Sequence, residues 1–128
     1  MKTTKIPKNY QHISPAGAEV RLLMDNKLGG IAHCTLRKGL ISKAVRHKTI
    51  CEFWHVLSGT GAIWRKNAEQ ESITELKQGM TIDIPLGTDF QYRSHEQDLV
   101  FICITLPPWP GSDEVVYVKH GTWVPSQS

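Results

Sequence analysis

The feature that most constrains the fold is a series of short β-rich runs, each closed by a glycine or proline turn. The runs recur at intervals of roughly ten residues, and no amphipathic helical pattern lies between them. Evenly spaced short strands with Gly and Pro turns predict an all-β sandwich or barrel. The expected strands are 17–26, 30–38, 43–57 (one long strand or two bent ones), 62–66, 72–77, 80–85, 89–94, 99–106 and 114–118.

Length and composition are those of one ordinary globular domain. The chain has 128 residues, 40% of them hydrophobic and 21% charged, and its net charge of +3 is dispersed. Its apolar runs fall short of the roughly 20 residues that span a bilayer, and residues 1–14 lack the apolar core of a secretory signal. We therefore expect a cytoplasmic protein that binds neither membrane nor nucleic acid.

The three cysteines, Cys34, Cys51 and Cys103, are widely spaced and lie in apolar β-like runs. They form no Cys-x-x-Cys pair, so buried reduced thiols are expected. The run 99–106 is almost continuously apolar, which predicts a strand covered on both faces.

Two stretches with related spacing carry the strongest signal. In the first, Gly39 is followed by Val45, His47, Glu52 and Gly59. In the second, Gly79 is followed by Pro85, Gly87, Phe90 and Ser94.

These spacings resemble the paired motifs of the cupin superfamily, whose first motif has Gly, His-x-His, Glu and Gly and whose second has Gly, Pro-x-Gly, His and Asn. The resemblance covers about residues 29 to 107. It implies a double-stranded β-helix, the RmlC-like jelly-roll barrel of small single-domain cupins. Outside the resemblance, residues 1–16 form a polar arm, either loose or lying along a neighbouring subunit; the barrel domain is expected at 17–118 and a tail at 119–128. From the habit of the family, the resemblance also implies a homodimer. Elution as a monomer at micromolar concentration would contradict the dimer.

The resemblance departs from the family at the metal ligands. Family members hold a divalent transition metal with three histidines and a glutamate, but Val45 and Phe90 stand where two of those histidines would be. His47 and Glu52 remain, and two protein ligands bind such ions weakly. A metal would therefore need a third ligand, for which His33 is the first candidate and Cys103 a weaker one. A cavity that needs no cofactor is the other interpretation.

Strand alternation predicts which side chains share a cavity. If Glu52 points into the barrel, Trp54 does too, while Phe53 points out. Phe90 and Tyr92 point in together, whereas Gln91 and Arg93 point out. We expect the cavity to be lined by Val45, His47, Glu52, Trp54, Phe90 and Tyr92, and Trp109, on a proline-rich loop, either to cap its mouth or to pack on a neighbour. The other histidines, His12, His55, His95 and His120, are expected at the surface.

Three functions fit this cavity. The first is binding of a small organic ligand, sugar-like or carboxylate, by a cupin whose metal site is degraded. The second is an enzyme that uses His47 and Glu52, either a metal-dependent isomerase, lyase or dioxygenase or a metal-free epimerase or isomerase with Tyr92 as the acid. The third is a structural dimer in which His47 and Glu52 only satisfy one another.

Overall fold

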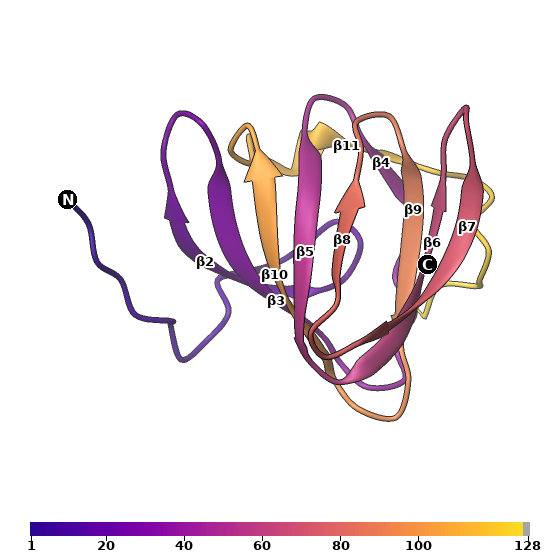
Figure 1. The fold of residues 1–128 in the computed structure, drawn as a ribbon, viewed down its shortest axis with the longest axis horizontal. Helices are drawn as coiled ribbons and strands as arrows, with labels where there is room; N and C mark the ends of the chain where they lie inside the picture. The colour runs from indigo at the N-terminus through magenta and orange to yellow at the C-terminus, as the bar shows by residue number, and fades with distance from the viewer. Residues whose placement is uncertain (127–128) are drawn as a thin grey trace.

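The computed structural model describes residues 1–126 and consists of two antiparallel sheets (Figure 1). One sheet has the strand order β1-β2-β3-β10-β5-β8 and the other has the order β11-β4-β9-β6-β7. This confirms the predicted all-β jelly roll. The elements are β1 His12–Ile13, β2 Glu19–Asp25, β3 Gly30–Leu36, β4 Val45–His47, β5 Cys51–Ser58, β6 Thr60–Lys66, β7 Glu71–Lys77, β8 Thr81–Ile84, β9 Asp89–Ser94, β10 Leu99–Leu106, the 3-10 turn η1 Ser112–Glu114, and β11 Val115–Tyr117.

The inward faces of the two sheets form one core. Alternate residues of each strand point inward because the side-chain period of a strand is two. The predicted run 43–57 folds as two strands, β4 and β5, separated by residues 48–50. Buried side chains from both sheets meet between them, among them Val20, Leu36, Val45, Trp54, Val56, Ile63, Phe90, Tyr92 and Phe101.

Strand β10 differs from its prediction. Leu99, Phe101, Cys103 and Thr105 are buried on the inner face, but the outward residues that alternate with them are only half-buried. The expectation that both faces of this strand are covered is therefore wrong for residues 1–126. The inner residues pack in the core, whereas the apolar residues between them form an outer face that stays partly exposed. Phe53 on the neighbouring β5 points outward as predicted and is 43% exposed. The homodimer that such a face would serve stays a prediction.

Both ends of the chain pack against the barrel. The arm, residues 1–16, contributes β1, which pairs with β2, and Arg21 donates hydrogen bonds to the carbonyl oxygens of Pro7 and Lys8. The N-terminus lies beyond β2 in Figure 1, and Thr4 Oγ1 donates a hydrogen bond of 3.0 Å to the Leu23 carbonyl oxygen of that strand. At the other end, Gln91 points away from the core yet is fully buried, since its amide bonds the backbone of Trp123. The last two residues of the predicted tail 119–128 lie outside the described residues.

Within residues 1–126, no helix has the length and apolar character needed to cross a lipid bilayer.

Candidate functional site

A cavity of about 420 Å³ lies inside the barrel. Seven residues singled out in the sequence line it together: Val45, His47, Glu52, Trp54, Phe90, Tyr92 and Trp109. The structure thus brings together the ligand-binding and acid–base candidates, while their roles stay predictions. His33 is not among the lining residues.

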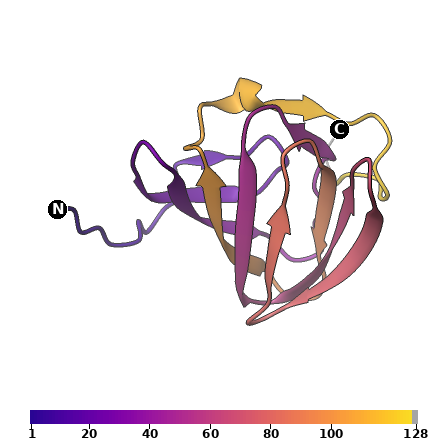
Figure 2. The same cartoon turned by 45° about the horizontal axis from the view of Figure 1, so that its top comes forward.

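Strand pairing explains how residues from distant parts of the chain meet here. In the second sheet, β4 lies between β9 and β11, so that Val45 pairs with Phe90 and His47 pairs with Val115. Glu52 and Trp54 come from β5 in the opposite sheet, two residues apart and therefore on one face. Figure 2 shows η1 and β11 in yellow at the top of the view, above the strands that carry these residues.

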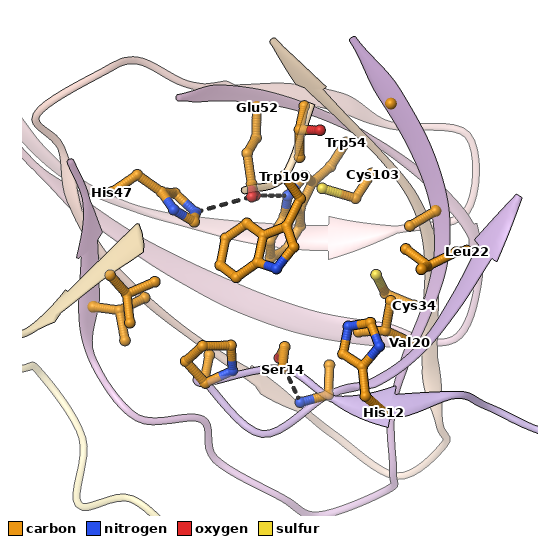
Figure 3. Close-up of a pocket in the computed structure, with 18 of the residues that line it drawn as sticks. His12, Ser14, Val20, Leu22, Cys34, His47, Glu52, Trp54, Cys103 and Trp109 are labelled. Carbon is orange, nitrogen blue, oxygen red and sulfur yellow. Dashed lines mark hydrogen bonds and ion pairs between the residues drawn. The ribbon is translucent and has the colours of Figure 1, made fainter. Parts of the chain in front are cut away.

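His47 and Glu52 form the polar cluster of the cavity. Each is 6% exposed, and His47 Nε2 lies 2.9 Å from Glu52 Oε2 (Figure 3). The second carboxylate oxygen, Glu52 Oε1, accepts a hydrogen bond of 2.8 Å from the Trp54 indole Nε1–H. Within residues 1–126 neither ring nitrogen of His47 has a hydrogen-bond partner in good alignment, so the 2.9 Å approach to Glu52 is a close contact rather than a directed hydrogen bond.

A second carboxylate, that of Glu114 on η1, stands on the other side of the imidazole. Its Oε2 lies 3.8 Å from His47 Nδ1, and the residue is 4% exposed. The carboxylate accepts hydrogen bonds from the backbone N–H groups of Lys48 and Thr49 and from the Thr49 hydroxyl. Burial alone would raise the pKa of Glu114, but these hydrogen bonds and the nearby His47 hold that pKa below its usual value. His47 therefore lies between two carboxylates.

Replacing Glu114 with glutamine is expected to lower the free energy of unfolding at neutral pH by about 1–3 kcal/mol, because an amide nitrogen would face buried N–H donors. The folded carboxyl has a pKa below the ordinary 4.5, so its contribution is present above that value and is lost as the pH falls through the folded pKa. Urea unfolding followed from neutral pH to about pH 3 should show the gap between wild type and Glu114→Gln narrowing. The exposed neighbour Asp113 supplies the control, since Asp113→Asn should stay within about 0.5 kcal/mol of wild type. A gap for Glu114→Gln that does not change with pH would contradict this role.

Four aromatic rings pack together along the cavity wall. Trp54 stacks on Phe101 with ring centroids 3.9 Å apart, and it meets Tyr92 edge-on at 4.8 Å and Phe90 edge-on at 6.2 Å. Trp109 meets His47 edge-on at 5.6 Å, which places it at the cavity, one of the two positions considered for it. Burial raises the pKa of Tyr92 well above its usual value, so its phenol stays protonated and can donate.

Two thiols also line the cavity. Cys103 pairs across the sheet with Ala32, and its neighbour Phe101 pairs with Cys34, so the two cysteines are diagonal neighbours on the inner face. A hydrogen bond with Cys34, together with burial, raises the pKa of Cys103 well above its usual value. The Cys103 thiol therefore stays neutral at ordinary pH. All three cysteines are free; Cys34 and Cys103 are buried as predicted, whereas Cys51, which points outward from β5, is only half-buried.

Of the two candidates for a third metal ligand, Cys103 lines the cavity and His33 does not. His33 lies on the outer side of β3, where it pairs with Arg21 and Ile102, because Ala32 and Cys34 occupy the inner side. Among residues 1–126, no three or more His, Cys, Asp or Glu side chains are grouped so that they could hold a metal ion. The side chains present therefore do not fit a metal held by three histidines and a glutamate as in the family.

The sequence prediction missed the N-terminal wall. His12 and Ser14 line the cavity, although His12 was expected at the surface (Figure 3). The cause is the pairing of β1 with β2, in which His12 faces Val20. Glu114 was missed as well, since its place beside His47 follows from the pairing of β11 with β4. Neither pairing leaves a local pattern in the sequence.

No protein-family model and no curated protein matches the chain. Solved structures do. Oxalate decarboxylase from Bacillus subtilis is similar with a TM-score of 0.75 and 11% identity, over 92% of this chain and 33% of that one. Pac13, described as a nucleoside dehydratase, is similar with a TM-score of 0.72 and 9% identity, over 92% of this chain and 91% of that one. KdgF from Halomonas sp. has a TM-score of 0.71 and 12% identity, over 85% of this chain and 97% of that one.

At these identities the likeness concerns the fold. The chain has the cupin fold, as its Gly and Pro spacings predicted. It spans 33% of the oxalate decarboxylase chain but more than nine-tenths of Pac13 and of KdgF, at 91% and 97%.

Proposed function

We propose that this cupin-fold chain binds a small organic molecule inside its barrel. The cavity itself is the observation that carries the proposal, since its volume of about 420 Å³ lies in the range of small-ligand sites. Its walls are mainly aliphatic and aromatic, and His47 and Glu52 supply a convergent polar group. The sugar-like and carboxylate ligands suggested by the sequence both carry groups that can hydrogen-bond this pair.

A second candidate is an enzyme that moves protons without a metal. The observation that favours it is the buried His47, whose ring nitrogens lack aligned partners within residues 1–126 and whose ring lies between the carboxylates of Glu52 and Glu114. A histidine with unbonded ring nitrogens in a cavity is the side chain that proteins most often use as a general base. Tyr92 keeps its proton and can serve as the acid. Epimerisation, isomerisation and dehydration are the reaction classes that need such a pair, and similar folds include Pac13, a nucleoside dehydratase.

The binding proposal is tested by a thermal-shift panel of small ring compounds and nucleosides, with uridine included because a Pac13 structure contains it. A compound that stabilises the wild type is expected to bind His47→Ala at least tenfold more weakly, a difference of about 1.4 kcal/mol. The matched control is His55→Ala, since His55 lies on the outer face of β5, exposed, beside Thr81. Equal binding of the compound by wild type and His47→Ala would show that His47 does not contribute to ligand binding.

Elemental analysis of protein purified without a metal-chelating tag separates the acid–base interpretation from the metal interpretation. We expect no stoichiometric transition metal in wild type or in His47→Ala. One equivalent of metal in the wild type, lost in His47→Ala, would mean that another ligand completes a site with His47 and Glu52.

A further inference from the structure

The cavity walls carry no permanent positive charge. The chain has 15 lysines and arginines and a net charge of +3, yet within residues 1–126 not one of these side chains lines the cavity. The charged or titratable side chains on the walls are His12, Asp25, His47 and Glu52, with the thiols of Cys34 and Cys103 and the phenol of Tyr92. The basic surface of the protein therefore does not continue into its interior.

The acidic side chains beside His47 are two carboxyl groups. Glu52 lies on the wall, and Glu114 lies directly behind His47, 3.8 Å from Nδ1. A proton on His47 would be balanced by the Glu52 oxygen at 2.9 Å, so even the charged imidazolium offers little attraction to an anion. Burial and the Cys34 thiol keep Tyr92 and Cys103 protonated, so they act as neutral donors.

Binding of an anionic ligand in such a cavity would be disfavoured for two reasons. Its charge would leave water without gaining a cationic partner, and it would lie close to the carboxylate of Glu52. An uncharged ligand of the same shape avoids both penalties and still buries its apolar surface. Arginine is the residue that proteins place where carboxylate or phosphate is bound, and this cavity has none within the described residues.

The walls also indicate the shape of the ligand. Trp54 and Phe90 supply aromatic rings from the two opposite sheets, and the Trp109 indole lies between His47 and His12 in the view of Figure 3. Aromatic walls favour flat or cyclic molecules that stack or meet them edge-on. Among the polar groups on the walls, His47 is the buried side chain whose two ring nitrogens both lack an aligned hydrogen bond within residues 1–126, so it can bond a polar group of the ligand.

We propose that the ligand is an uncharged ring compound with a hydroxyl or carbonyl group that hydrogen-bonds His47, and that the cavity excludes carboxylates and phosphates. The inference rests on the proposed binding function and narrows its ligand class. Of the two classes that the sequence suggested, it retains the uncharged sugar-like one and rejects the carboxylate one.

Three probes that share one ring test the charge class: benzyl alcohol, benzoate and benzylammonium, each titrated at neutral pH by calorimetry or by ligand-observed NMR. Benzyl alcohol is expected to bind at least tenfold more tightly than benzoate. In Glu52→Gln, which removes the wall charge, the gap between these two probes should fall severalfold. Glu71→Gln is the matched control, because Glu71 also accepts an indole hydrogen bond of 2.8 Å, from Trp64, but lies outside the cavity.

The outcomes separate the two proposals. Benzoate binding as tightly as benzyl alcohol, or more tightly, would overturn the charge class while leaving the binding function in place. Tightest binding by benzylammonium would overturn it in favour of a cationic ligand. Absence of binding by all three probes would count against the cavity as a ring-binding site, and so against the proposed function on which the inference rests.

Discussion

Replacing Trp54 with alanine is expected to lower the free energy of unfolding by about 3–5 kcal/mol, the usual cost of deleting a large buried aromatic side chain. Trp54 is 2% exposed, and its ring stacks on Phe101 and meets Phe90 and Tyr92 edge-on. Single domains have only about 5–15 kcal/mol of stability in total, so this change would remove a large fraction of it. Urea unfolding followed by circular dichroism measures the loss.

A milder change isolates the polar contribution of the same residue. Trp54→Phe keeps an aromatic ring against Phe101 but removes the N–H that Glu52 Oε1 accepts, leaving a buried carboxylate oxygen without that donor. An unsatisfied buried acceptor costs about 1–3 kcal/mol in addition to the lost ring volume. The variant should also weaken ligand binding, because the orientation of Glu52 beside His47 depends on the indole.

The chain provides a matched control for this change. Trp64 is 3% exposed and donates the same kind of hydrogen bond to Glu71, but Glu71 is exposed and water can replace the indole there. Trp64→Phe should therefore cost less stability than Trp54→Phe and leave ligand binding unchanged. If the two phenylalanine variants lose equal stability, the buried Trp54–Glu52 hydrogen bond contributes no more to stability than the exposed Trp64–Glu71 hydrogen bond.

Most of the fold could be predicted because its signals are local. A strand buried on one face alternates apolar and polar residues, and turns need Gly or Pro, so both can be recognised within a few residues. Strand β10 was predicted with its observed bounds, Leu99–Leu106, and β9 likewise at Asp89–Ser94. The failure at β10 has the same origin, since a continuous apolar run does not reveal whether its second face is covered.

The composition of the site could be predicted from strand alternation, but its electrostatics could not. Glu52 and Trp54 share a face because they are two residues apart, and the cavity confirms that geometry. Glu114 stands 67 positions after His47 and reaches it only because η1 leads into β11 and β11 pairs with β4. His12 enters the cavity through the pairing of the two-residue strand β1 with β2, which no pattern in the polar arm indicates. Contacts of this kind depend on topology, which the residues concerned do not encode locally.

Replacing Gly59 with alanine is expected to cost about 4 kcal/mol or more, far beyond the ordinary effect of a turn substitution. Gly59 has φ of 80°, and an added Cβ would overlap the carbonyl oxygen of Asp98 and lie 2.9 Å from its carbonyl carbon. The backbone of Asp98 is held in place, because its carboxylate accepts a hydrogen bond from Lys38 N–H at 2.8 Å and contacts the Arg37 guanidinium at 3.0 Å. The substitution must therefore distort the junction of β5, β6 and β10.

Gly39, the first glycine of the same motif, separates this clash from backbone preference. Its φ is 74°, close to that of Gly59, but among residues 1–126 no atom beyond its two chain neighbours lies within 4 Å of an added Cβ. Gly39→Ala should therefore cost only the roughly 1–2 kcal/mol of placing an L-residue in the left-handed region. Urea unfolding of Gly59→Ala and Gly39→Ala under the same conditions measures how much of the cost at Gly59 comes from the clash rather than from the positive φ. A similar loss in both would mean that positive φ alone explains these glycines, whereas a much larger loss at Gly59 would show that close approach to the Asp98 backbone fixes glycine at the end of the first motif.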